Sequence, residues 1–112
     1  MPEERLVLNG VGASKGIYEG RARIILDPKG IGTLQEGDVL VTRYTAPDWV
    51  EAYLSISAVV TDEGSPSSHQ AIICRQFGIP CVVGTSYATE RIRDGEQIIV
   101  DGDKGEVTYR LG

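Results

Sequence analysis

The amino-acid sequence predicts a mixed α/β fold with helices on one side of mixed β-sheets. Short apolar runs rich in Val and Ile, bounded by Gly, Pro or Asp, recur along the chain and are typical of strands. In the middle of the chain, a strand pattern, a helical pattern and a second strand pattern follow one another. This order predicts a βαβ unit with two parallel strands. The elements before and after the unit are expected to pair antiparallel.

The composition limits the kinds of protein this chain can be. Its 112 residues are expected to form a single domain, residues 1–112. The net charge of −5 argues against nucleic-acid binding, and no apolar run approaches the roughly 18 residues of a membrane span. The first residues lack the pattern of a secretory signal, and two cysteines are too few for a disulfide framework. A reduced, cytoplasmic setting is therefore expected.

Strands are expected where a run of β-branched residues lies between turn residues. The expected strands are Arg5–Leu8, Gly20–Leu26, Asp38–Arg43, Ala58–Thr61, Cys81–Val83, Gln97–Val100 and Glu106–Arg110. The last two flank Asp101-Gly-Asp-Lys-Gly105, a sequence typical of a hairpin loop.

Two helices are expected from the signals at their ends. The first begins at Thr45, with Asp48 in the position of a capping box. The second covers His69–Phe77, after which Gly78 supplies a left-handed stop. A weaker helical turn is expected at Tyr87–Ile92.

The most informative segment is the loop between the strand that ends at Thr61 and the helix that begins at His69. Ligands of open α/β sheets gather at the carboxyl ends of the strands. The first turn of a helix has free N–H groups and a partial positive charge, which favour an anion. His69, the single histidine of the chain, is therefore well placed to attack phosphorus and to hold a phosphoryl group beside those N–H groups.

Position alone permits this chemistry without selecting it. A single histidine at a helix start is most often a surface or cap residue, and a pair such as Ser67–Ser68 is most often a plain N-cap. Two other roles therefore stay open. One is a non-catalytic module used for docking, and the other is a module that binds an anion reversibly at the same helix N-terminus.

A longer motif covers the same segment and is more specific. Its pattern is T-x-x-G-G-x-[TS]-[SC]-H-x-[AS]-I-x-A-R-x-x-G-I-P-x-V-V-G. The residues that match it are Thr61, Gly64, Ser67, Ser68, His69, Ala71, Ile72, Arg75, Gly78, Ile79, Pro80, Val82, Val83 and Gly84. On these residues the chain resembles the phosphohistidine domain, also called the mobile or swivelling domain, of the phosphoenolpyruvate-utilising enzymes, the phosphoenolpyruvate synthase and pyruvate phosphate dikinase family.

Further motifs extend the resemblance over nearly the whole chain. They are the opening glycines of Gly10–Gly16 and Gly20, the strand Gly37–Val41, the helix start Pro47-Asp-Trp49 and the closing hairpin Val100–Gly105. The resemblance implies a swivelling β/β/α fold. The chain departs from the family pattern beside the histidine: Ser65 and Pro66 stand where the family has a second glycine and its successor, and Gln70 stands where alanine is common. None of these departures removes the nucleophile.

The resemblance also implies roles for the residues of the loop. His69 is the implied phosphoryl acceptor and donor, reacting through Nε2 while a neighbouring group holds Nδ1. Gly64, Ser65, Ser67 and Ser68 are the implied supports of the phosphate, and the last two are also expected to cap the helix. No residue of this set is expected to bind a metal.

Arg75 matches the arginine of the family motif and is counted among the supporting residues. It follows His69 by six residues, which is about 9 Å along a helix. A direct clamp on the phosphate of that histidine would therefore be strained. A salt bridge, or a contact with the active site of a partner, is expected instead.

Three further pairs of residues have a structural and a functional interpretation. Cys74 and Cys81 are expected to be buried free thiols, with a redox pair as the alternative. Asp62 and Glu63 either orient the histidine or lie solvated in the loop. The aromatic pair at positions 49 and 53 is expected in the core rather than as a stacking platform.

The function implied by the resemblance is that of a phosphotransferase component. Such a domain accepts a phosphoryl group on His69 and relays it between an ATP site and a phosphoenolpyruvate/pyruvate-type site. In the family, these sites lie on a nucleotide-binding domain of the ATP-grasp type and on a TIM barrel that uses Mg²⁺. A chain of 112 residues is too short to hold either. ATP, phosphoenolpyruvate and Mg²⁺ are therefore expected on partner domains or subunits, and no cofactor is expected to bind this domain.

Overall fold

The computed structural model describes residues 3–45 and 55–111, so most of the helix expected to begin at Thr45 falls outside the described residues, as do positions 49 and 53. The strands are β1 Glu3–Asn9, β2 Val11–Ser14, β3 Ile17–Ile24, β4 Val39–Thr42, β5 Ala58–Thr61, β6 Cys81–Val83, β7 Gln97–Asp101 and β8 Glu106–Leu111. The helices are the 3₁₀ helix η1 Pro28–Thr33, α1 His69–Phe77 and α2 Ala88–Arg91. Among the described residues, every helix is too short or too polar to cross a lipid bilayer.

The strands form one mixed sheet in the order β1-β8-β7-β3-β4-β5-β6-β2. The predicted βαβ unit is confirmed, because β5 and β6 flank α1 in the chain and pair parallel, with Val59 opposite Cys81. The prediction that the elements before this unit pair antiparallel is wrong for β4, which pairs parallel with both β3 and β5. Parallel neighbours need a crossover between them, and the segment between β4 and β5 is long enough to supply one.

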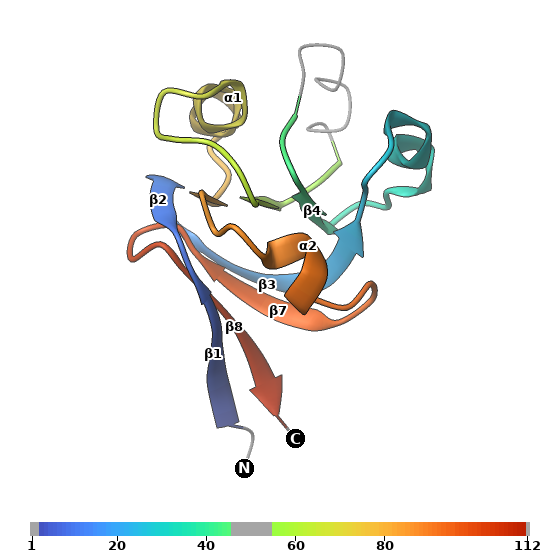
Figure 1. Ribbon diagram of the computed structural model, residues 1–112, viewed down its shortest axis with the longest axis vertical. Helices are drawn as coiled ribbons and strands as arrows, with labels where there is room; N and C mark the ends of the chain where they lie inside the picture. Colours follow the sequence, from blue (N-terminus) through green and yellow to red (C-terminus); the bar gives the residue numbers. More distant parts are fainter. Residues whose placement is uncertain (1–2, 46–54, 112) are drawn as a thin grey trace.

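The sheet bends at β3 into two layers, and a third layer covers one of them (Figure 1). β3 pairs antiparallel with β7 on one side and parallel with β4 on the other, so it belongs to both layers. Helices α1 and η1 lie over the outer face of the parallel layer, while the single turn of α2 lies beside the space between the two layers (Figure 1). The predicted mixed α/β class with a β/β/α arrangement is confirmed.

Alternation along the parallel strands explains why they read as continuous apolar runs. Successive side chains of a strand point to opposite faces. In β4, Val39 and Val41 join the inner core between the two sheet layers, whereas Leu40 joins the core under α1, and all three are fully buried. Strands covered on both faces have no polar side to show.

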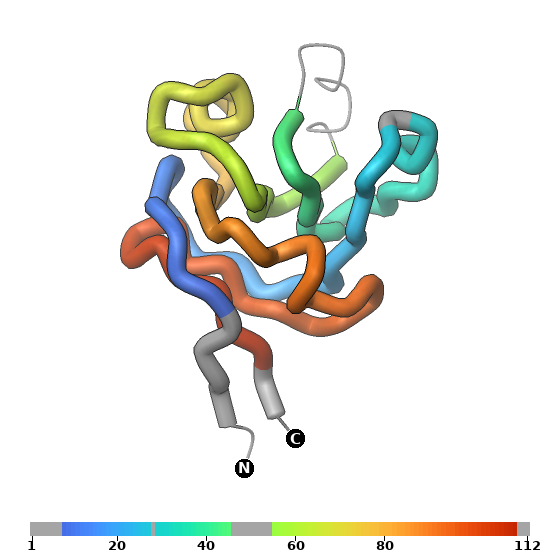
Figure 2. Tube along the Cα trace, in the orientation of Figure 1, coloured from blue at the N-terminus to red at the C-terminus, as the bar shows by residue number. Residues whose placement is uncertain are grey.

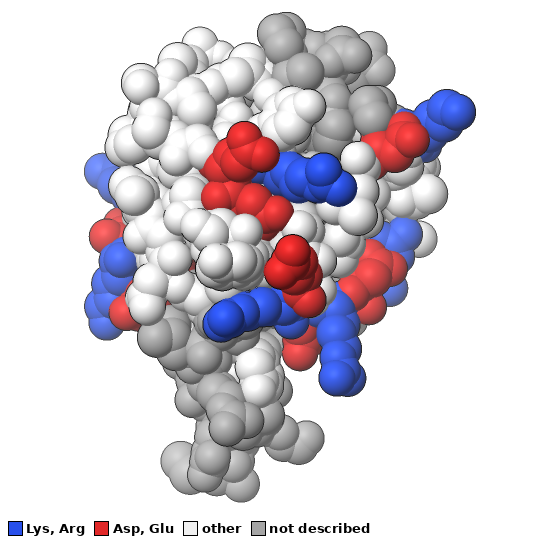
Figure 3. Space-filling view, in the orientation of Figure 1, with Lys and Arg blue, Asp and Glu red and all other residues white. Residues whose placement is uncertain are grey.

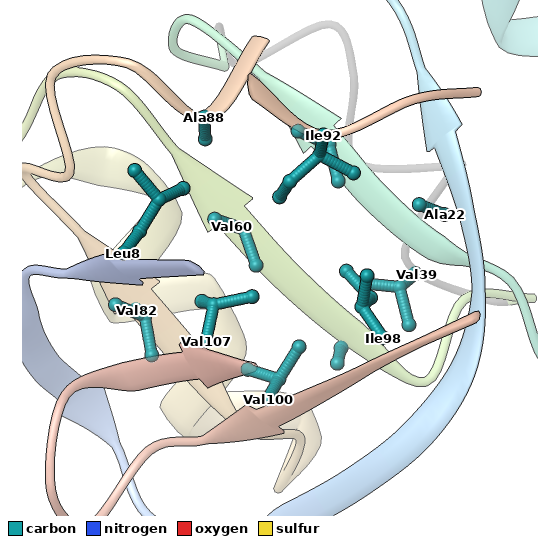
Figure 4. Packing of buried hydrophobic residues seen from close by; sticks show 12 residues of the cluster. Leu8, Ala22, Val39, Val60, Val82, Ala88, Ile92, Ile98, Val100 and Val107 are labelled. Carbon is teal, nitrogen blue, oxygen red and sulfur yellow. The ribbon is translucent and has the colours of Figure 1, made fainter. Parts of the chain in front are cut away.

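The inner core brings together residues from nearly every strand, and Figure 4 shows their side chains pointing toward one another. Its buried members are Leu8, Ala22, Val39, Val41, Ala58, Val60, Val82, Ala88, Ile92, Ile98, Val100 and Val107. Ala88 and Ile92 come from α2 and the residue after it, so this short helix closes the core from its open side. The core thus fixes the parallel strands whose ends carry the candidate site.

Strand β2 was not expected, since Val11-Gly-Ala-Ser14 lacks the apolar alternation of a strand. It pairs antiparallel with β6 and passes against the turn between β7 and β8 (Figure 2). That turn is the predicted hairpin loop, in which the Asp101 carboxylate accepts hydrogen bonds from the backbone N–H groups of Asp103 and Lys104, each at 3.0 Å. The first and last motifs of the sequence are therefore neighbours in space.

The two cysteines are free thiols and lie fully buried between α1 and the parallel strands. This confirms the interpretation of Cys74 and Cys81 as buried free thiols. A hydrogen bond between the two thiols, followed by burial, raises the pKa of Cys74 above its ordinary value of 9.0.

Alkaline pH is therefore expected to weaken the fold through Cys74. Since the pKa of this thiol is higher in the folded than in the unfolded chain, its contribution is fully present below the unfolded value of 9.0 and is lost as the pH rises further. Urea unfolding at pH values from about 7 to about 10.5 measures this loss. The free energy of unfolding of a Cys74→Ala variant should decline less over that range, and an equal decline in both proteins would contradict the assignment.

Candidate active site

The candidate site lies where the parallel strands end. Because parallel strands deliver their carboxyl ends to the same edge of a sheet, the segments after β4 and β5 leave side by side. Thr42 lies opposite Thr61 in the ladder, and the pairing continues beyond it, as the backbone N–H of Asp62 donates to the carbonyl of Thr42 at 3.1 Å. The N–H of Glu63 then donates to the carbonyl of Arg43 at 2.9 Å.

This edge brings Thr45 to His69. The Thr45 hydroxyl lies 3.0 Å from His69 Nδ1, within hydrogen-bond distance, and the ring is half-buried while Thr45 is 6% exposed. The contact engages Nδ1, so Nε2 is the ring nitrogen that this bond does not occupy. The sequence motif implied that a neighbour holds Nδ1, and the structure assigns that neighbour to Thr45.

The loop before His69 folds into a tight turn built from serines. Within it, the backbone N–H of Ser68 donates to the carbonyl of Ser65 at 3.0 Å, and the Ser68 hydroxyl donates to the same carbonyl at 2.6 Å. The hydroxyls of Ser65 and Ser67 lie 3.1 Å apart. Three of the predicted supporting residues are thus close to one another in the turn that leads into His69.

Ser68 occupies the N-cap position of α1 with extended backbone angles, but its side chain makes no capping hydrogen bond. The prediction of side-chain capping by Ser68 is therefore wrong. The Ser68 hydroxyl turns back to the loop instead, where its oxygen accepts from the backbone N–H of Ser65 at 3.3 Å and its proton is donated to the Ser65 carbonyl at 2.6 Å. At the other end of α1, Gly78 has the predicted left-handed conformation, with φ of 69°.

Gly64 and Gln70 pack against each other at the start of the loop. Gly64 has φ of +118°, and a Cβ there would overlap the side-chain amide of Gln70. Gln70 is 2% exposed, and its amide donates to the carbonyl of Glu63 at 3.0 Å and to the hydroxyl of Thr61 at 3.3 Å. Gly64 therefore acts here as the residue that makes room for Gln70.

Arg75 lies on α1 and reaches back past the loop. Its guanidinium donates to the carbonyls of Pro66 and Ala13, each at 2.8 Å. Both bonds that the described residues show for Arg75 go to backbone carbonyls rather than to a carboxylate, and the alternative contact with a partner stays a prediction. The carbonyl of Ala13 is available because the register between β2 and β6 shifts between Gly12 and Ser14.

The two acidic residues after β5 have separate positions. The Asp62 carboxylate accepts hydrogen bonds from the backbone N–H and the hydroxyl of Thr89, at 2.9 and 2.6 Å. It therefore ties the loop to α2 and neither orients His69 nor lies freely solvated. The Glu63 side chain is exposed, and its backbone carbonyl receives the hydroxyl of Thr61 at 2.6 Å.

Two large apolar side chains near the histidine are exposed. Ile72 follows His69 by one helical turn and is 43% exposed, while Tyr44 precedes Thr45 and is 57% exposed. In Figure 3, uncharged side chains cover much of the upper part of this face, where Figure 1 draws α1, and charged side chains of both signs lie across the sheets. Glu63 in the loop and Arg75 on α1 are also exposed. The site thus combines a held imidazole, a serine turn and two exposed apolar side chains.

Residues 34–105 match the family model described as the PEP-utilising enzyme, mobile domain. This chain belongs to that family. Among curated relatives, the mobile domain is 49% identical over 105 residues to the phosphoenolpyruvate synthase of Pyrococcus furiosus. It is 47% identical over 105 residues to the probable phosphoenolpyruvate synthase of Archaeoglobus fulgidus, and 46% identical over 99 residues to the uncharacterized phosphotransferase YvkC of Bacillus subtilis.

These matches cover most of the mobile domain and a small part of each relative. The two synthases align with 94% of this chain, which spans 13% of the Pyrococcus protein and 14% of the Archaeoglobus protein. The match to YvkC covers 88% of this chain and 12% of that protein. The relatives therefore contain much that this chain does not.

Solved structures agree with the fold. A solution structure of Enzyme I (nEIt) is 33% identical, with a TM-score of 0.60 over 69% of this chain and 32% of that chain. The holo form of aconitase X from Thermococcus kodakaraensis is 18% identical, with a TM-score of 0.69 over 98% of this chain and 99% of that chain. The second likeness concerns the fold alone.

Proposed function

We propose that this chain is a phosphoryl carrier that becomes transiently phosphorylated on His69. The observation that carries the proposal is the placement of His69, which begins α1 beside a serine turn and has Nδ1 held by Thr45. Membership of the mobile-domain family supports it, as do the relatives named phosphoenolpyruvate synthase. The free N–H groups at the start of α1 favour the negative charge of a phosphoryl group.

The transfer step follows from the hydrogen bond to Thr45. When Nδ1–H donates to the Thr45 hydroxyl, the proton sits on Nδ1 and Nε2 carries the lone pair. Nε2 attacks the phosphorus of the donor, the N–P bond forms, and the P–O bond to the leaving group breaks with its electron pair on that oxygen. The resulting phosphohistidine returns its phosphoryl group to an acceptor oxygen in the reverse sense.

The donor and acceptor sites are proposed to lie on partner domains or subunits. One partner would hold ATP in an ATP-grasp-type site, and the other would hold phosphoenolpyruvate or pyruvate with Mg²⁺ in a TIM barrel. Two facts support such a division, namely the small share of each relative that this chain spans and the exposed apolar side chains of Ile72 and Tyr44 near His69. In this arrangement the carrier supplies covalent catalysis, and the partners supply most of the charge stabilisation.

Labelling with radioactive phosphoenolpyruvate tests the carrier role. The chain is incubated with Mg²⁺ and with the remaining domains of a phosphoenolpyruvate synthase prepared without their own mobile domain, and the phosphate bound to the chain is counted. We expect close to one phosphate per chain, labile in acid and stable in alkali, as a phosphoramidate bond requires. Tandem mass spectrometry should place it on His69.

Other outcomes of this experiment point elsewhere. Absence of label with phosphoenolpyruvate and with ATP would exclude the carrier role and favour the docking module. Reversible binding of phosphate, seen in titrations without covalent label, would favour the anion-binding module. Label that survives acid would indicate a serine ester in the turn of Ser65–Ser68.

Replacing Thr45 by valine is expected to slow labelling of the chain by about tenfold to a hundredfold. Valine keeps the shape of threonine but removes the hydroxyl that holds Nδ1, so the ring samples the wrong tautomer and orientation. Single-turnover labelling at saturating donor measures the rate.

Thr45→Ser is the matched control, because it retains the hydroxyl and should keep most of the rate. Thermal unfolding of both variants shows whether the 6% exposed side chain is also needed for the fold. A Thr45→Val chain that labels at the wild-type rate would contradict the orienting role.

A further inference from the structure

We infer that Arg75 and Gln70 are positioning residues of the phosphohistidine site, which together hold the loop before His69 at two points. This inference rests on the proposed function. Neither side chain is a nucleophile, and the hydrogen bonds that the structure shows for them go to oxygens of the chain itself. Both act on His69 through the loop.

Gln70 holds the first arm of the loop, which is the part that directly follows β5 and includes Glu63 and Gly64. This glutamine directly follows His69 and lies almost fully buried, so its amide donors need partners inside the protein. They find the Glu63 carbonyl at 3.0 Å and the Thr61 hydroxyl at 3.3 Å, which lie at the end of β5. A residue with a Cβ in place of Gly64 would overlap this amide, so the first arm is shaped around Gln70.

Arg75 holds the second arm of the loop, which is the part that contains Pro66 and leads into His69. One nitrogen of the arginine fork takes the Pro66 carbonyl in the turn, and another takes the Ala13 carbonyl on β2, each at 2.8 Å. The second acceptor belongs to a strand of the sheet, which pairs with β6. The guanidinium therefore connects the turn to the sheet, and a planar fork with several donors is suited to two acceptors at once.

The loop between these two points contains the serine turn, which leads directly into His69. Because both tethers come from α1 itself, the helix that carries the nucleophile also carries the two side chains that hold its loop. Holding the loop before the donor arrives removes an ordering step from the reaction.

The test compares Arg75→Ala, Arg75→Lys and Gln70→Ala with two matched controls. Arg93→Ala removes an exposed arginine from the loop before β7, and Gln76→Ala removes an exposed glutamine from α1. Two donors are used: phosphoenolpyruvate with the partner domains described above, and phosphoramidate. The second donor needs no partner, because its P–N bond breaks with ammonia as leaving group while the bond to Nε2 forms.

We expect Arg75→Ala and Gln70→Ala to label about tenfold more slowly with either donor. For phosphoenolpyruvate the loss should appear in kcat rather than in KM. Amide hydrogen exchange at Ser67 and Ser68 should become at least about tenfold faster. Guanidinium ions at millimolar concentration should restore part of the rate of Arg75→Ala only, and Arg75→Lys should be intermediate, since one ammonium replaces a fork. The two control variants should behave as wild type.

Each alternative result decides the matter. Unchanged labelling in the Arg75 and Gln70 variants would overturn the inference, even if exchange in the loop becomes faster. If the labelling rates of the variants fall only in proportion to their thermal stability, and guanidinium does not restore the rate, both residues have a structural role only. If the wild-type chain labels with phosphoramidate but not with phosphoenolpyruvate or ATP, the carrier role is refuted. The effect of Arg75 and Gln70 on the loop can then still be measured with phosphoramidate. Absence of label with any donor would refute both the carrier role and the positioning role.

Discussion

Replacing His69 by alanine is expected to abolish phosphoryl labelling, to below about one-thousandth of the wild-type rate. The chain has a single histidine, so no second imidazole can take over the transfer. The serine hydroxyls of the turn are weaker nucleophiles without an adjacent base, and the Ser68 hydroxyl already donates to the Ser65 carbonyl at 2.6 Å. Labelling by phosphoenolpyruvate and the partner domains, counted after separation in alkali, measures the effect.

The His69→Ala variant is expected to stay folded, because the ring is only half-buried at the start of α1. Thermal unfolding should show a midpoint within a few degrees of the wild type, so that loss of label reports chemistry rather than unfolding. His69→Gln is a second variant that keeps a polar side chain of similar reach near Thr45. Label that persists in both variants would move the nucleophile to Ser67 or Ser68.

Local signals in the sequence were enough for the centre of the fold. β5, α1 and β6 have the predicted bounds, because an apolar run, a helix start and Gly78 each mark an end within a few residues. The loop between β5 and α1 was therefore identified as the candidate site from sequence alone, with the histidine at the helix start. The resemblance to the mobile-domain family then selected phosphoryl chemistry from the roles that the position allows.

Contacts between distant parts of the chain could not be predicted in the same way. Thr45 and His69 are 24 residues apart, and Arg75 and Ala13 are 62 residues apart. A hydroxyl beside a predicted helix start indicates a cap, and only the parallel pairing of β4 with β5 turns Thr45 toward the histidine. The sequence did contain a signal for that parallel pairing, because the elements expected over residues 38–61 follow the order strand, helix, strand, as in the βαβ unit after them.

The edges of the fold depend even more on tertiary contacts. β2 was missed because two of its first three residues are not apolar β formers, and β3 begins earlier than expected, at Ile17. What holds β2 in place is the close approach of its backbone to the turn between β7 and β8, where glycines from opposite ends of the chain meet. This approach leads to the second large effect.

Replacing Gly102 by alanine is expected to lower the free energy of unfolding by at least about 3 kcal/mol. A Cβ at Gly102 would overlap the backbone carbonyl of Ser14, and a Cβ at Gly12 would overlap the carbonyl of Gly102. Since the obstacles are backbone atoms, one in a paired strand and one in the hairpin turn, no side-chain rotation relieves them. Urea unfolding at constant pH measures the change, and Gly12→Ala should show a loss of similar size.

Gly32→Ala is the matched control, because nothing lies within 4 Å of a Cβ built at this position of η1. It should be neutral or stabilising by up to about 1 kcal/mol, since alanine reduces the freedom of the unfolded chain. Equal midpoints for Gly102→Ala and Gly32→Ala would contradict the close packing of β2 on the hairpin. Because the carbonyl of Ala13 on β2 is one of the two acceptors of Arg75, a shifted β2 should also slow labelling of His69 in chains that remain folded. A glycine far from the histidine in sequence would then affect the reaction through the strand that anchors its loop.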